Sequence, residues 1–175
     1  MNQILKLLSG GDRRSIGRSD EVVELILQQP DKFDDLFRGF YETDPVIRMR
    51  TADAVEKVTA QDPALLIPYK EPMLELLESA EQIEVQWHLA QIIPRLPLTN
   101  DEISRAYQTM EKYLSSSSAI VQTCGLQCLF DLSLRDARLL ASTRSYLESG
   151  MENQSKAVRS RSRNLMKELE KHEKR

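Results

Sequence analysis

The chain has 175 residues, of which 41% are hydrophobic and 29% are charged, and its formal net charge is -3. This length supports one buried core, and the small numbers of Gly and Pro, 6 and 7, exclude a disordered or fibrous protein. The negative charge argues against a protein that coats nucleic acid, because such binding depends on Lys and Arg displacing phosphate counterions.

Capping and turn residues divide the chain into helical segments, and no segment shows the period-two alternation of a strand. The first long helix is predicted from Ser19-Asp20 to Gln29, and Pro30 ends it. Later helices are expected to begin at further caps: Asp31, Asp44-Pro45, Asp62-Pro63, Thr99-Asn100-Asp101-Glu102, Ser116 to Ser118, Asp136 and Ser155. The chain is therefore predicted to be all-α.

Four of the predicted helices share one pattern, which makes the sequence an internal repeat. The shared pattern begins at Ile47, Val85, Val121 and Val158, at intervals of 38, 36 and 37 residues. A second, more variable amphipathic helix precedes each of these helices. A two-helix unit of this length cannot bury its apolar faces alone, so stacking of the units is expected to form one continuous core.

The repeat resembles the HEAT repeat of armadillo-like proteins. Asp44-Pro45-Val46-Ile47-Arg48, followed by Ala52, Ala54 and Val55, resembles the second helix of that repeat, as does Ser155-Lys156-Ala157-Val158-Arg159. Gln86 and Gln122 stand where the family usually has Arg, so no continuous ladder of charged bonds is expected. The resemblance is to small bacterial HEAT-repeat proteins and covers about residues 31 to 173.

This resemblance implies an α-α superhelix, or solenoid, of about four HEAT-like helical hairpins with an N-terminal capping segment. The capping segment is expected at residues 1–30, and the hairpins at about 31–60, 62–97, 99–134 and 136–173. Such a fold implies a binding platform rather than a particular chemistry.

In a HEAT solenoid the second helix of each hairpin lines the concave side. At 100° per residue, positions 2, 6 and 9 of the repeat point away from its apolar positions. Three large apolar residues and three amides occupy such positions: Met49, Trp87, Phe130, Gln91, Gln127 and Asn164. Aromatic anchors dominate many interfaces, and amides suit hydrogen bonding to a peptide backbone. A partner-binding face is therefore predicted, although Trp87 could instead pack against a neighbouring hairpin.

Basic residues near the same helices suggest a positive rim of the concave face that would steer an acidic partner. They are Arg48, Arg50, Arg95, Arg159, Arg161, Arg163 and Lys167, with Arg13, Arg14 and Arg18 in a Gly-containing loop. Of these, Arg48, Arg50, Arg159 and Arg161 are predicted to form the rim that steers the partner. The alternative is an ordinary solvated surface with Arg–Asp pairs between hairpins.

Catalytic and metal-binding patterns are weak, so no enzyme, cofactor or metal is expected. His172 lies in a charged C-terminal run, and His88 is interpreted as a packing residue. Cys124 and Cys128 lack the spacing of a zinc site, and four residues apart on one helix they are poorly placed for a disulfide. A reducing compartment is indicated. Since the chain shows neither a signal peptide nor an apolar run of membrane-spanning length, a cytoplasmic protein is expected.

The predicted function is that of a non-catalytic scaffold or adaptor, a monomer that binds a protein or peptide of acidic character. One alternative is a DNA-binding protein related to the HEAT-like glycosylases for alkylated bases, in which Trp87 would line the cleft. Gln91 then stands where a carboxylate is wanted, and the nearest acids, Asp53 and Asp131, do not match that family. A second alternative is an accessory chaperone or lyase-like factor.

Overall fold

The computed structural model describes residues 2–12 and 14–174, and over these residues the chain is helical without strands. The α-helices, in chain order, are α1 Gln3–Leu8, α2 Ser19–Gln28, α3 Phe33–Phe37, α4 Pro45–Gln61, α5 Lys70–Ser79, α6 Ile83–Ile92, α7 Asn100–Tyr113, α8 Ala119–Ser133, α9 Leu140–Met151 and α10 Lys156–Glu173. Short 3₁₀-helices connect them: η1 Pro30–Lys32, η2 Arg38–Tyr41, η3 Pro63–Tyr69, η4 Ile93–Arg95 and η5 Ala137–Leu139. Within this described part, no helix is long and apolar enough to cross a membrane.

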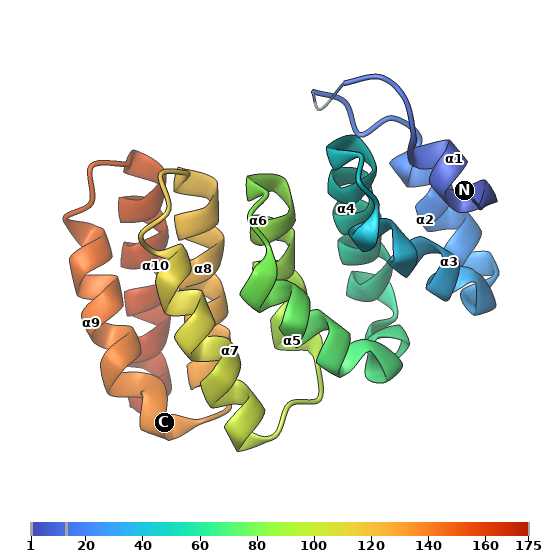
Figure 1. The fold of residues 1–175 in the computed structure, drawn as a ribbon. Coiled ribbons are helices and arrows are strands. Elements are labelled where there is room, and N and C mark those ends of the chain that lie inside the picture. The colour runs from blue at the N-terminus through green and yellow to red at the C-terminus, as the bar shows by residue number, and fades with distance from the viewer. Residues whose placement is uncertain (1, 13, 175) are drawn as a thin grey trace.

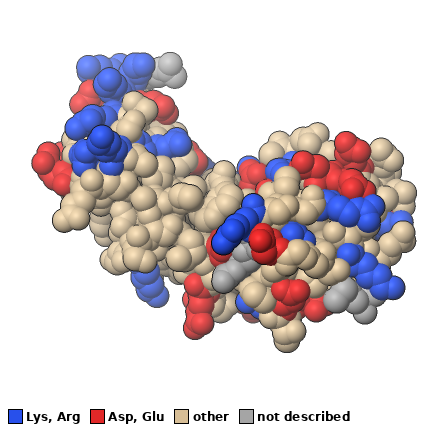
Figure 2. All heavy atoms as spheres, turned by 90° about the horizontal axis from the view of Figure 1, so that it is seen from above, with Lys and Arg blue, Asp and Glu red and all other residues tan. Residues whose placement is uncertain are grey.

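The helices form two layers along a curved stack, with the chain termini at opposite ends (Figure 1). The even-numbered helices pack side by side from α2 through α4, α6 and α8 to α10. Contacts within the odd-numbered layer are sparser, and α3–α5 and α7–α9 make few of them. The more closely packed layer lies on the inner side of the curve, so the even-numbered helices line the concave face. Seen from above, the surface is hollowed between the two ends of the molecule (Figure 2).

Most of the predicted caps are present. Asp44 accepts a hydrogen bond from the Val46 amide at 2.8 Å, and Thr99 and Glu102 form a complete capping box. Ser118 and Asp136 also cap their helices, whereas Ser155 makes no side-chain capping bond.

Four predicted helix starts differ from the structure. Asp31 lies inside the 3₁₀-helix η1, and α3 starts at Phe33. Asp136 caps the 3₁₀-helix η5, and α9 starts at Leu140.

Ser19 is the first residue of α2 rather than its cap, and its buried hydroxyl donates to Asp53 on α4. Asp62-Pro63 begins the 3₁₀-helix η3, and α5 starts only at Lys70. Pro68 lies inside η3, and its missing N–H and its ring both oppose an α-helix through that position.

One contact recurs at the start of every repeated helix. The residue after the first apolar position donates to the carbonyl six residues earlier: Arg48 to Glu42, Gln86 to Ala80, Gln122 to Ser116 and Arg159 to Asn153, at 2.6–2.8 Å. Glutamine therefore makes the same bond as arginine without its charge. Amides also join neighbouring repeats, since Arg48 donates to Gln82 at 3.0 Å and Asn153 donates to Gln122 at 3.1 Å.

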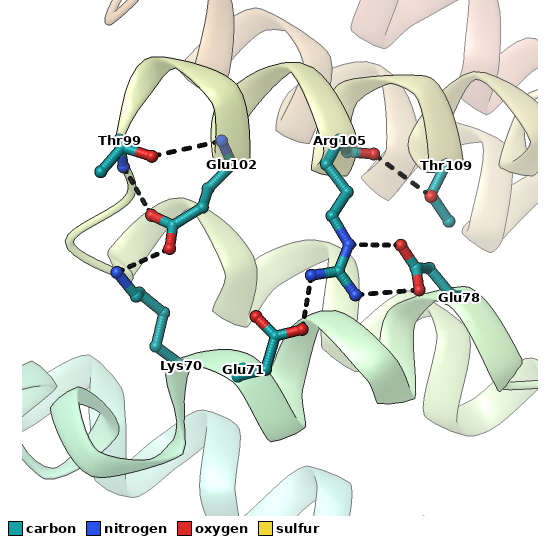
Figure 3. Close-up of polar contacts among 7 residues, drawn as sticks. All are labelled: Lys70, Glu71, Glu78, Thr99, Glu102, Arg105 and Thr109. Atoms are coloured by element: carbon teal, nitrogen blue, oxygen red, sulfur yellow. Dashed lines mark hydrogen bonds and ion pairs between the residues drawn. The ribbon is translucent and has the colours of Figure 1, made fainter.

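Ion pairs link α5 to α7 in the odd-numbered layer (Figure 3). Arg105 binds Glu78 through two nitrogens at 2.6 and 3.0 Å and reaches Glu71 at 2.6 Å. Lys70 pairs with Glu102, the acid of the capping box, at 2.7 Å. These contacts lie on the outer layer and fix the register of adjacent hairpins rather than form part of the concave face.

Candidate functional site

Position 6 of the repeat holds one polar side chain on each of α4, α6, α8 and α10: Asp53, Gln91, Gln127 and Asn164. Gln127 already uses both ends of its amide, donating to Asp131 at 2.9 Å and accepting from Arg161 at 2.7 Å. Gln91 donates only to the Trp87 carbonyl of its own helix, at 3.3 Å, and Asn164 is exposed. Gln91 and Asn164 can therefore bind an incoming group without breaking a contact between helices.

Trp87 is half-buried in the middle helix of the concave face and lies beside a pocket of about 200 Å³. Its ring packs on that of His88, with centroids 3.5 Å apart and planes inclined by 31°. The pocket walls come from α4, α6 and the loop between α1 and α2, through Arg14, Ser15, Ile16, Met49, Arg50, Asp53, Glu84, Trp87 and His88. The structure thus brings Trp87 and Met49 together, as the sequence predicts, but with a loop as a third wall.

His88 is a buried, neutral member of this pocket wall. Its side chain is 3% exposed, and burial lowers its pKa to about 4, with Asp53 raising and Lys57 lowering the pKa to smaller extents. Its Nδ1 atom has no hydrogen-bond partner. At physiological pH His88 is therefore neutral, and it contributes an aromatic ring rather than a positive charge to the pocket wall.

The expected exposure of Met49 and Phe130 is wrong. Met49 is 7% and Phe130 is 4% exposed. Phe130 packs with Leu126 and Leu165 in the core between α8 and α10, and Met49 is part of the lining of the pocket beside Trp87. A helical-wheel projection treats a helix as buried on one side only. An inner helix of the stack contacts its own hairpin partner and two neighbouring helices, so a narrower strip of its surface is exposed to solvent.

The predicted basic rim also needs correction. Arg50 is 2% exposed and binds backbone carbonyls of the loop between α1 and α2. Arg48 and Arg159 are held by carbonyls at the starts of their own helices. Of the four, only Arg161 is exposed, and it already binds Gln127. Arg13 lies outside the described residues.

A row of exposed cations lies along α10 and its C-cap residue. Five side chains recur at intervals of seven, four, four and three residues and so share one helix face: Lys156, Arg163, Lys167, Lys171 and Lys174. None of them forms an ion pair with another described residue. Figure 2 shows Lys and Arg gathered at the end of the molecule that α9 and α10 form. The helical spacing of these cations is visible in the sequence. A search of the whole last helix, beyond the first residues of its repeat, could therefore have found the full stripe.

The acids of the concave face do not assemble a catalytic or metal site. Asp53 lines the Trp87 pocket, but Lys57 pairs with it at 2.9 Å. Asp131 accepts a hydrogen bond from Gln127, and burial raises the pKa of its carboxyl group. Burial also raises the pKa of the thiols of Cys124 and Cys128. Among residues 2–12 and 14–174, no group of His, Cys, Asp and Glu side chains is placed to hold a metal ion.

Comparison with known structures places the fold among helical repeats. An engineered protein matches with a TM-score of 0.67 and 15% identity, over 96% of this chain and 78% of that protein. Cex1p matches with a TM-score of 0.62 and 15% identity over 96% of this chain, which spans only 35% of Cex1p. A computationally designed armadillo repeat protein for modular peptide recognition gives a TM-score of 0.58 and 14% identity, over 97% and 86% of the two chains.

At these identities the structural likeness shows the fold alone, and no curated protein matches the sequence. The family model of the HEAT repeat domain, however, matches residues 9–169. That match covers nearly the whole stack, including α2 and all four copies of the repeated helix. The chain belongs to the HEAT-repeat family.

Proposed function

We propose that this chain is a non-catalytic scaffold whose concave face binds an extended segment of a partner protein. The HEAT and armadillo fold commonly serves as a protein-binding scaffold, and the designed armadillo protein of similar fold was made for peptide recognition. Fold alone does not assign a function, so the proposal depends on the site.

The observation that carries the proposal is the position of Trp87. It is half-buried in α6, the middle helix of the concave layer, beside a pocket and one turn before Gln91. A partly open aromatic ring supplies a large contact area, and the adjacent amide can both donate to and accept from a peptide main chain. This combination suits an extended segment with one anchoring side chain.

The cations of α10 favour an acidic end of that segment. Arg161 and Asn164 continue the concave face onto α10, and the free stripe that includes Arg163 and Lys167 lies next to them. Exposed charges of this kind mainly raise the association rate, and salt screens them. The stripe replaces Arg48 and Arg50 as the group that would steer an acidic partner.

A selection from a random library of displayed peptides tests the proposal. Affinities of the selected peptides are then measured by fluorescence anisotropy for wild type and variants. Trp87→Ala should weaken binding at least about tenfold, because it removes the anchor. The matched control is Tyr41→Ala, which truncates a 61%-exposed aromatic on η2, outside the concave layer, and should leave affinity unchanged.

Two results would contradict the scaffold proposal. One is equal affinity of folded Trp87→Ala and wild type for every selected peptide. The other is failure to select any peptide, together with release of free base from duplex DNA that carries an alkylated base. A large loss of thermal stability in Trp87→Ala would instead identify Trp87 as a core residue.

A further inference from the structure

The loop between α1 and α2 is folded around one side chain of α4. The buried guanidinium of Arg50 donates to five backbone carbonyls of this region, at 2.6–3.4 Å: Leu8, Ser9, Gly10, Asp12 and Ser15. Leu8 and Ser9 end α1, where carbonyls without helical partners attract a cation. Arg50 therefore satisfies a helix end and the following loop at the same time.

Glycines allow the loop to approach Arg50 this closely. Gly11 and Gly17 have φ values of 74° and 58°, in the left-handed region that other residues rarely adopt. A Cβ atom on Gly17 would lie 2.7 Å from Cζ of Arg50, which is too close for a carbon–carbon contact. The loop conformation is thus specific to this arginine and these glycines.

The loop completes the pocket beside Trp87. Arg14, Ser15 and Ile16 form the wall that faces α4 and α6. The apolar part of the lining is Ile16, Met49 and Trp87. Among the lining residues, the charges of Arg14 and Arg50 are balanced by those of Asp53 and Glu84. The pocket therefore has no net charge with which to select an ionised ligand.

We propose that this pocket holds one uncharged apolar side chain, of about the size of methionine, and that Arg50 is the positioning residue that builds the pocket by folding the loop. A volume of about 200 Å³ is below that of sites for drug-sized molecules and fits a single side chain. That the side chain comes from a partner protein rests on the proposed function.

Trp87 provides a direct measurement, because it is the only tryptophan of the chain. Its emission is followed while N-acetyl-methionine amide is added to the purified protein. We expect a saturable change with a millimolar dissociation constant, and no saturable change with the N-acetyl amides of glycine, lysine or glutamate. No response to the methionine probe, or equal responses to the charged probes, would overturn the pocket.

A matched pair of variants locates the probe without disturbing the core. Ile16 is 43% exposed and Ile67, on η3, is 59% exposed. Ile16→Glu replaces an apolar part of the pocket wall by a charged group and should weaken probe binding at least about tenfold, because an apolar side chain would then have to desolvate a carboxylate. Ile67→Glu should leave it unchanged. Equal effects of the two variants would show that the probe binds elsewhere.

The role of Arg50 is tested with Arg50→Lys, which keeps the charge but cannot reach five carbonyls. Hydrogen exchange should accelerate at the amides of residues 9–18 and not in α6 or α8, and the affinity for the probe should fall. Unchanged probe affinity with a faster-exchanging loop would overturn this role.

The scaffold proposal and the pocket proposal can fail separately. If selected peptides bind in a way that needs Trp87 but the methionine probe gives no response, only the pocket proposal is overturned. If the probe responds but no peptide can be selected, only the scaffold proposal is overturned.

Discussion

Within the hairpins, residues that face each other complement one another in volume. Gly39 faces Thr51 between η2 and α4, and Gly150 faces Ser162 between α9 and α10. In the third repeat the small residue lies on the other helix, since Gly125 of α8 faces Tyr113. These three hairpins thus bring their helices together with different pairs of residues, because close packing constrains the summed volume of a pair rather than the volume of either residue.

These pairs predict opposite effects of adding one methyl group. In Gly125→Ala the new Cβ lies 3.4 Å from Leu114 and 3.5 Å from Tyr113, so it fits, and loss of a helical glycine should stabilise by up to about 1 kcal/mol. In Gly150→Ala the Cβ would overlap the Ser162 hydroxyl, at a cost of about 1–3 kcal/mol. Urea denaturation of both variants measures the difference.

Two further variants check this assignment. Gly125→Leu should destabilise, since Leu114 and Tyr113 leave no room for a long side chain. Ser162→Ala should recover most of the stability lost in Gly150→Ala, because the Ser162 hydroxyl is the atom in the way and has no hydrogen bond to lose. Equal stability of all these proteins would show that the two layers are not in close contact at these positions.

His88 makes stability depend on pH in a defined direction. Its folded-state pKa of about 4 lies below the ordinary value of 6.5, so the unfolded chain takes up the proton first. The contribution is therefore complete above pH 6.5 and is lost as the pH falls towards 4, by about 3 kcal/mol at most. Denaturation of wild type and His88→Leu across this range should show a weaker pH dependence in the variant. Parallel pH profiles would mean that His88 is not buried in the folded state.

At the scale of the element, a repeated bond ties each inner helix to the chain before it. Gln122 donates to the Ser116 carbonyl at 2.6 Å and accepts from Asn153 of the next hairpin at 3.1 Å. Arg48 donates the equivalent main-chain bond in the first repeat, to Glu42, and it also donates to Gln82 of the next hairpin. The position therefore requires a long donor rather than a positive charge.

This requirement predicts that Gln122→Ala lowers the free energy of unfolding by about 1–2 kcal/mol, because the bond to the Ser116 carbonyl and the bond from Asn153 are both lost. Gln122→Arg should be close to wild type, since arginine makes the same contact in α4 and α10. Guanidinium denaturation provides the measurement. A Gln122→Arg variant as unstable as Gln122→Ala would indicate that the amide, and not the donor, is what the site needs.

At the scale of the whole molecule, the core is divided. A larger cluster of buried residues runs from α1 to α8, and a smaller one joins α8, α9 and α10 through residues such as Leu126, Leu147, Val158 and Leu165. Helix α10 has one neighbouring hairpin, and its opposite face carries the free cations. In a linear stack, stability depends on contacts with neighbours, so the final hairpin has fewer of them.

Native-state hydrogen exchange should therefore show α9 and α10 opening at a lower free energy than α4, α6 and α8. Phe130→Ala should increase this difference in opening free energy, because Phe130 of α8 belongs to the smaller cluster. Met49→Ala, on α4, is the control: Met49 lies outside the smaller cluster, so this variant should not increase the difference. One common opening free energy for all helices would show that the solenoid unfolds as a single unit.

Caps and apolar spacing act within a few residues of the chain, so the amino-acid sequence is enough to predict the all-α class, the period of the repeat and several helix starts. The sequence also predicts that Trp87 lies at the centre of the concave face. Which residues of that face are open depends on how neighbouring helices and loops pack. Arg50 meets its carbonyl partners across 35 to 42 residues of chain, and Phe130 is covered by a helix that a single-helix wheel does not include. Exposure depends on such distant neighbours, and local periodicity contains no information about them.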